Sequence, residues 1–152
     1  AILLSFLIIV SCGFKPLYEN ANREDIFKEI EIQTPSNKIG FFIKEALNSK
    51  SRYSQNGSFI VQIQPSVTSS YSAITKENEI TRYSVTMNVD YELIEKKNRT
   101  IYFKGKETAT SDYSAALTYT GFATEVAKKD TYKRLAETIA EKINTQIIIK
   151  FR

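Results

Sequence analysis

The chain has 152 residues, of which 42% are hydrophobic and 25% are charged, and its formal net charge is +4. This length and composition suit one globular domain, and the charge falls well short of that of a dedicated nucleic-acid binder. The chain has no histidine and a single cysteine, so it lacks the usual general base and the commonest metal ligand, and cannot form an intramolecular disulfide. We therefore expect a protein with no cofactor, no metal site and no enzyme chemistry.

The first residues have the pattern of a targeting segment. Residues 1–10 read AILLSFLIIV, an apolar run about half as long as a transmembrane helix, as in the hydrophobic region of a secretory signal peptide. The sequence then continues Ser11-Cys12-Gly13, which resembles a lipobox, in which the cysteine sulfur carries a diacylglycerol. We predict that residues 1–11 are a partial signal peptide and that Cys12 is acylated; the alternative is a core strand with a buried free thiol. By the usual sorting rule, Gly13 in place of Asp favours the outer membrane.

The first half of the remaining chain predicts a strand, a helix and a second strand. Residues 12–25 are an extended and polar lead, and the single domain is expected over residues 26–152. Alternating isoleucines predict a half-buried strand over 26–33, and helical spacing of apolar residues predicts a helix over 37–50. A further strand is predicted over 58–64; its continuation past Pro65 would require an edge or a bulge.

A hairpin is predicted next. After a turn at 77–79, apolar and polar residues alternate strictly from 82 to 93, as in an antiparallel strand with one packed face and one wet face. Residues 95–99 form the hairpin loop and residues 100–110 the partner strand. Residues 111–121 are small and polar, which favours a loop.

The longest helix is predicted from Phe122 onward, where apolar residues recur every three or four positions. The stripe consists of Phe122, Val126, Tyr132, Leu135, Ala136, Ile139, Ala140, Ile143 and Ile147. Residues 147–149 are apolar all round and could belong to the core or to a partner-facing patch. The predicted fold is α+β, with two helices packed on one face of a mostly antiparallel four-stranded mixed sheet.

Two segments carry a resemblance to a known family. The run Cys12-Gly13-Phe14-Lys15-Pro16-Leu17-Tyr18 resembles the start of mature lipopolysaccharide-assembly lipoproteins of the LptE family. The C-terminal stretch resembles the same family at Tyr119, Phe122-Ala123, Ala127, Asp130, Arg134-Leu135, Ile139-Ala140 and Ile143. The resemblance implies a non-catalytic outer-membrane lipoprotein, facing the periplasm. Such a protein plugs the large β-barrel LptD, helps it to fold, and assists delivery of lipopolysaccharide to the outer leaflet.

A cluster of cations marks the candidate ligand site. Lys96, Lys97 and Arg99 lie in the predicted hairpin loop, and Lys104 and Lys106 share one face of the returning strand. Lipid A and the inner-core sugars are anionic, so these side chains are candidate lipopolysaccharide contacts. The alternative is a solvated turn whose charges protect a sheet edge.

Other functions remain open on the sequence alone. A lipid-anchored interaction subunit of another envelope system, such as an ABC-type lipid transporter or a secretin, would have the same features. A periplasmic hydrolase is a further alternative, although Glu29 and Glu31 on one strand face are more simply explained as a wet surface than as a catalytic pair.

Overall fold

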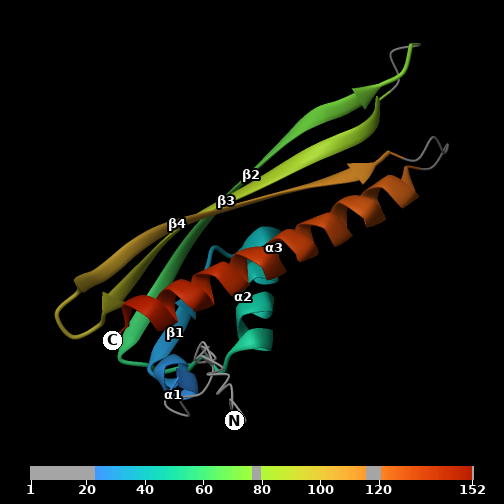
Figure 1. Ribbon diagram of the computed structural model, residues 1–152. Helices are drawn as coiled ribbons and strands as arrows, with labels where there is room; N and C mark the ends of the chain where they lie inside the picture. Colours follow the sequence, from blue (N-terminus) through green and yellow to red (C-terminus); the bar gives the residue numbers. More distant parts are fainter. Residues whose placement is uncertain (1–22, 77–79, 116–120, 152) are drawn as a thin grey trace, which may run out of the picture.

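The computed structural model describes residues 23–76, 80–115 and 121–151. The fold is α+β, as predicted, with the four strands in the order β1-β2-β3-β4 and the long helices on one face of the sheet (Figure 1). The predicted signal peptide at residues 1–11, Cys12, the first part of the predicted lead (residues 13–22) and the predicted turn at 77–79 lie outside the described residues. Residues 23–25, the rest of the predicted lead, are helical.

The first two elements differ from the prediction of one strand over residues 26–33. The chain forms a short helix, α1 (Arg23–Lys28), and only then β1 (Ile30–Gln33). Phe27 on α1 is 3% exposed and belongs to the same core as Ile30 and Ile32. Alternation alone could not separate these elements, because a short helix buries one residue per turn and mimics a strand over so few positions.

The second strand is much longer than predicted. β2 (Phe59–Ile74) pairs in parallel with β1 through residues 59–62 and antiparallel with β3 along its whole length, with a register shift between Tyr71 and Ala73. The amide of Phe59 donates to the carbonyl of Glu29, on the β1 side. Pro65 lies six residues further on, so its nitrogen points to that same outer side, beyond the end of β1. No ladder hydrogen bond is lost, and the strand continues as an edge.

The third and fourth strands form the predicted hairpin. β3 (Ile80–Glu95) pairs with β4 (Thr100–Ser114), and a β-bulge separates the pair Ile94–Ile101 from the pair Leu93–Phe103. β4 includes residues 111–114, which were predicted as loop. That prediction was wrong because Tyr113 is buried there and its ring stacks on Tyr83 of the neighbouring strand, with 5.1 Å between centroids. Tertiary packing thus overrides the weak strand propensity of a small, polar sequence.

The two long helices, α2 (Lys38–Lys50) and α3 (Phe122–Lys150), cover one face of the sheet. The Asn37 side chain caps α2 by accepting a hydrogen bond from the Gly40 amide at 2.8 Å. The largest fully buried side chains of the core are Tyr91, Ile30, Ile43, Leu47, Ile63, Met87, Leu93, Ile139, Ile143, Ile147, Val61 and Val85.

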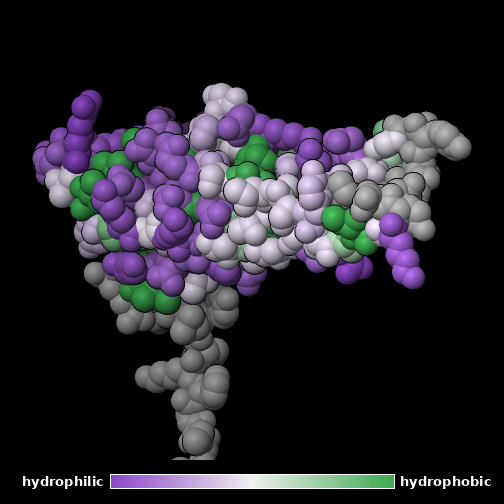
Figure 2. Space-filling view, turned by 90° about the horizontal axis from the view of Figure 1, so that it is seen from above, coloured by the Kyte–Doolittle hydropathy of each residue, from purple (hydrophilic) through white to green (hydrophobic). Residues whose placement is uncertain are grey.

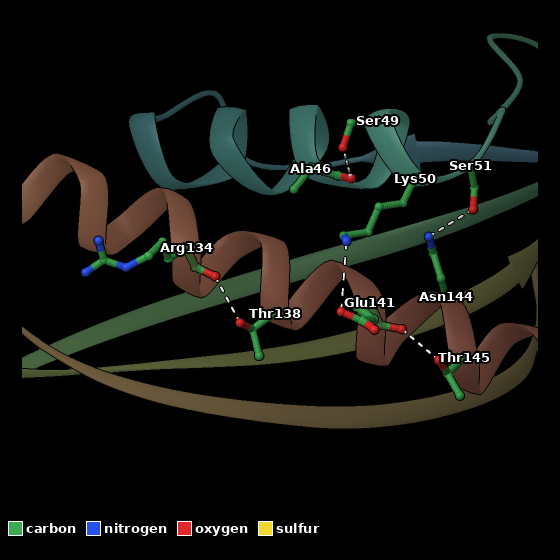
Figure 3. A network of polar contacts seen from close by, with 9 residues as sticks. All are labelled: Ala46, Ser49, Lys50, Ser51, Arg134, Thr138, Glu141, Asn144 and Thr145. Atoms are coloured by element: carbon green, nitrogen blue, oxygen red, sulfur yellow. Dashed lines mark hydrogen bonds and ion pairs between the residues drawn. The ribbon is translucent and has the colours of Figure 1, made fainter.

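A polar network joins the two helices inside this packing (Figure 3). Asn144 of α3 is 7% exposed; its amide nitrogen donates to Ser51 Oγ at 2.9 Å, while the Tyr53 hydroxyl donates to its amide oxygen. Lys50 and Glu141 form an exposed ion pair above it at 3.9 Å. Because both functional ends of the buried amide are satisfied, the network fixes how α3 lies on α2 without leaving an unpaired polar group.

The apolar stripe of α3 is buried only from its third turn onward. Leu135, Ile139 and Ile143 are in the core, whereas Phe122 is 71% and Val126 41% exposed, so the first two members of the predicted stripe do not face it. At the other end Ile147 is buried and Ile149 is 53% exposed. The core alternative for residues 147–149 therefore holds for Ile147, whereas Ile149 lies on the surface.

The molecule is elongated and has two unlike ends (Figure 1). The broad end contains α1, the 96–99 loop and the C-terminus of α3. The narrow end contains the far parts of β2, β3 and β4 and the N-terminus of α3. Hydrophobic side chains come to the surface as separate patches at both ends (Figure 2). Within the described residues, no helix has the length and apolar character needed to cross a bilayer.

Candidate functional site

The predicted cations are divided by the structure into two groups. Residues 96–99 form the loop between β3 and β4; the predicted loop over 95–99 is one residue longer, because Glu95 still pairs with Thr100 and ends β3. Lys104 and Lys106 lie further along β4, on the sheet face that the helices leave open. The open face also presents Ser66, Thr68, Ser70, Ser84, Thr86, Asn88, Thr108 and Thr110.

A single extra residue determines that the two lysines face solvent. Without the bulge, the hairpin register would place Lys104 opposite Tyr91, on the core face. Tyr102 is the extra residue, and it shifts the register so that Phe103 lies opposite Leu93 and Lys104 opposite Glu92. Because directly opposed residues of antiparallel strands share a face, the bulge moves the aromatic ring inward and the ammonium group outward.

Both strand lysines already have partners. Lys104 Nζ lies 2.6 Å from Glu92 Oε1, and Lys106 Nζ lies 3.7 Å from Asp90 Oδ1, each across the β3–β4 ladder. An anionic ligand would have to share these lysines with carboxylates. Exposed pairs of this kind contribute only about 0–1 kcal/mol, so such sharing costs little.

The loop has one paired and two unpaired cations. Lys96 Nζ forms an ion pair with Glu31 Oε2 of β1 at 2.5 Å, and its amide donates to the carbonyl of Ser58. Lys97 and Arg99 are exposed, and no carboxylate in the described part of the chain forms an ion pair with either. Arg99 has φ 52°, a left-handed conformation at the last residue of the loop.

Aromatic residues lie directly beside this loop. Phe59, Tyr102 and Phe151 meet with ring centroids 4.9–6.0 Å apart, joining the starts of β2 and β4 to the end of α3. Tyr102 is 52% and Ile101 43% exposed. The cations therefore stand next to apolar surface, which is the pairing of groups that an amphiphilic anion requires.

The carboxylates considered as a catalytic pair, Glu29 and Glu31, have separate partners. The part of the chain that the structure describes contains no group of three acidic or cysteine side chains that could hold a metal ion. Glu29 accepts a hydrogen bond from Ser58 at 3.0 Å, and Glu31 is engaged by Lys96, so the two carboxylates are occupied separately. The most perturbed acid is Tyr53, whose burial raises the pKa of its phenol and keeps it neutral.

Sequence reasoning missed a row of tyrosines at the narrow end. Tyr71, Tyr83 and Tyr113 lie on neighbouring strands, with ring centroids 5.6 and 5.1 Å apart. The sequence offered one clue, because Tyr83 is the first residue of the apolar alternation in β3. Tyr113, however, lay in a predicted loop. Only the strand register brings the three rings together.

The fold and the site define a class: a two-layer α+β domain with a cationic hairpin beside exposed apolar residues. A model of the LptE family, described as lipopolysaccharide-assembly, matches residues 27–147. This match spans well over half of the chain, which therefore belongs to the LptE family. Membership assigns to the chain a role in lipopolysaccharide transport and outer-membrane assembly.

Individual relatives share part of the sequence or the fold. The chain is 25% identical over 145 residues to the uncharacterized protein RP188 of Rickettsia prowazekii, covering 95% of this chain and 91% of that protein. Two solved structures share the fold. A lipoprotein structure from Caulobacter crescentus CB15 has a TM-score of 0.69 at 20% identity, covering 85% of this chain and 95% of that one. Rare lipoprotein B of Shewanella oneidensis has a TM-score of 0.55 at 11% identity, covering 81% and 98%.

Proposed function

We propose that this chain is an outer-membrane lipoprotein, acylated at Cys12, that assists assembly of the LptD β-barrel and delivery of lipopolysaccharide to the outer leaflet. It acts as a plug inside the barrel and catalyses no reaction. The observation that carries the proposal is the match to the LptE family over residues 27–147.

The open face of the sheet supports the plug role on physical grounds. The interior of a large outer-membrane barrel is polar and water-filled, so a domain inside it must present polar surface. Thr86 Oγ1 and Thr110 Oγ1 share a hydrogen bond at 3.0 Å, and Thr108 Oγ1 donates to Asn88 at 2.8 Å. Their remaining hydrogen-bonding capacity points to solvent and can be met equally well by water or by the polar side chains of a barrel wall.

The hairpin supplies the proposed lipopolysaccharide contacts. Lys97 and Arg99 are the principal contacts, because their charges are unpaired among the described residues. Lys96, Lys104 and Lys106 contribute less, since each must share its charge with a carboxylate.

The partner is tested by a pull-down from detergent-solubilised outer membrane, followed by mass spectrometry. We expect a large β-barrel of the LptD type to be retained by the tagged chain. Recovery of an ABC-type lipid transporter or a secretin in its place would establish the alternative role, that of a lipid-anchored interaction subunit of another envelope system.

The acylation is tested by Cys12→Ser. The serine oxygen cannot form the thioether, so the variant should accumulate as unprocessed precursor or as soluble periplasmic protein, while wild type fractionates with the outer membrane. Mature, acylated Cys12→Ser protein in the outer membrane would contradict the proposed lipidation site.

A further inference from the structure

We infer that the broad end of the molecule rests on the phospholipid surface of the membrane, with Ile101, Tyr102 and Ile149 at the interface. The inference rests on the proposed acylation of Cys12 and concerns the acylated chain outside a barrel. It adds to the acylation an orientation and a second lipid contact, made by the folded domain itself.

The first observation is the kind of side chain exposed there. Ile101, Tyr102 and Ile149 are 43%, 52% and 53% exposed, so large apolar surface faces outward at this end. Tyr102 packs against Phe59 and Phe151, so its ring lies in a fixed aromatic cluster. Tyrosine is enriched at membrane–water interfaces because its ring prefers the apolar side and its hydroxyl prefers water.

The second observation is the arrangement of charge around this apolar surface. Lys150 Nζ lies 5.4 Å from the centroid of the Phe103 ring, which is itself 6.4 Å from the Tyr102 ring. Lys97 and Arg99 stand at the tip of the adjoining loop. Long cationic side chains of this kind place their stems on apolar surface and their charges at the level of lipid phosphates. Of the neighbouring carboxylates, Glu31 is paired with Lys96, which offsets its repulsion toward anionic lipid, whereas Glu95 accepts a hydrogen bond from Asn98 and keeps its charge.

The third observation is that the broad end is where the tether joins the domain. α1 begins at Arg23, and β1 follows it directly. The carbonyl of Glu29 accepts from the amide of Phe59, and the Phe59 ring lies 4.9 Å from that of Phe151 at the end of α3. The start of the domain, the hairpin loop and the C-terminus of α3 are therefore neighbours.

Chain length then selects which end can reach the bilayer. Residues 12–22 connect Cys12 to α1, and these eleven residues span at most about 40 Å when fully extended, at roughly 3.5 Å each. α3 alone has 29 residues and is about 44 Å long at about 1.5 Å per residue. If the narrow end lay on the membrane with α3 upright, α1 would stand about the length of α3 away, slightly beyond even the fully extended tether. The broad end has no such difficulty.

The narrow end is the rival surface, since it also exposes Tyr71, Ile74 and Phe122, at 62%, 57% and 71%. The reach of the tether argues against a bilayer contact at the narrow end, which leaves that end for a protein partner. A reporter of lipid contact should therefore respond at the broad end and not at the narrow end.

Because the chain has no tryptophan, the fluorescence of a single introduced tryptophan reports on its own position. Tyr102→Trp and Tyr71→Trp each create a single reporter, at positions of similar exposure on opposite ends. The full acylated chain is bound to vesicles of phosphatidylethanolamine and phosphatidylglycerol whose acyl chains are brominated near the head group. We expect at least two-fold quenching and a blue-shifted emission for Trp at 102, and little change for Trp at 71.

Three results would overturn the inference: no quenching at position 102, quenching at position 71 equal to that at 102, or no binding of the acylated chain to these vesicles. Thermal unfolding of both variants controls for misfolding, and Ile101→Trp is a second reporter if Tyr102→Trp is unstable. The vesicles contain neither lipopolysaccharide nor barrel, so a failed pull-down with positive quenching contradicts the barrel role alone, and the reverse result contradicts the orientation alone.

Discussion

At the scale of single residues, one neighbouring side chain, Tyr91, explains why position 105 is a glycine. Gly105 lies opposite Tyr91 on the core face of β4, and a Cβ at this position would overlap the Cζ and hydroxyl atoms of that ring. Tyr91 is 2% exposed and meets Phe103 edge-on, so its ring has little room to move away. The glycine is therefore required by packing rather than by backbone conformation.

Gly105→Ala should destabilise the domain by about 1–3 kcal/mol, the usual cost of overpacking a core. Chemical denaturation of both proteins measures the difference. The matched control is the same change in a Tyr91→Leu background, where the shorter side chain makes room and the penalty should shrink. A penalty of equal size in both backgrounds would mean that the ring is not its cause.

Tyr91 also predicts how stability depends on alkaline pH. Its burial, and then the nearby Glu107 carboxylate, raise the pKa of the phenol to about 12 from the usual 10. The unfolded chain therefore loses this proton first, and the stability present below pH 10 is lost as pH rises toward 12. Urea unfolding of wild type and Tyr91→Phe between pH 9 and about 11.5 should give a shallower decline in the variant. Identical slopes would contradict the assignment.

At the scale of elements, the third to seventh turns of α3 hold the two layers together. Leu135 is 2% exposed and sits between the buried residues of α2 and the sheet. Leu135→Asp buries a carboxylate without a partner, which costs several kcal/mol against a total stability of about 5–15 kcal/mol. We expect loss of cooperative thermal unfolding or of soluble yield.

The control for this change is Glu137→Asp, on the exposed side of the same helix. It introduces the same residue at a cost of only about 0.5 kcal/mol in helix propensity. A melting profile of Leu135→Asp that matches the control would place the stripe away from the core.

The elements that the sequence predicted well are those with long, regular periodicity. The alternation in β3 and the buried part of the α3 stripe each extend over many positions, so local exceptions do not obscure the period. The failures have specific causes. α1 is too short to show a period, and residues 111–114 became strand only through the contact of Tyr113 with Tyr83.

The candidate site was predicted in part for a related reason. The sequence pattern locates the cations of the hairpin loop, because a loop is expected between two predicted strands. The pairing of Lys104 with Glu92 and of Lys106 with Asp90 depends on the bulge at Tyr102, and one extra residue in a strand leaves no signature in composition.

At the scale of the whole molecule, the surface features separate along the long axis. The start of α1, the cationic loop and the exposed aromatic cluster gather at the broad end, whereas the tyrosine row and the exposed start of α3 lie at the narrow end (Figure 1). The polar open face connects the two. The proposed lipid contact at one end and the proposed protein contact at the other therefore need no movement within the domain.

The last prediction concerns the hairpin cations, tested as Lys97→Gln with Arg99→Asn. Asparagine is chosen because it tolerates the left-handed conformation that Arg99 adopts, so the loop should keep its shape. Two exposed charge contacts together contribute roughly 1–2 kcal/mol, which corresponds to about a 5- to 30-fold loss of lipopolysaccharide affinity at low salt. The remaining binding should depend less on salt, and the melting temperature should hardly change.

The matched control is Lys38→Gln with Lys44→Gln on the exposed side of α2, which removes the same net charge away from the loop. Binding is measured at two salt concentrations on the unacylated chain from residue 13 onward, which contains all the helices and strands described. If the loop variant binds as tightly as the control variant at low salt, the affinity reflects overall charge, and the hairpin is a solvated turn that protects the sheet edge.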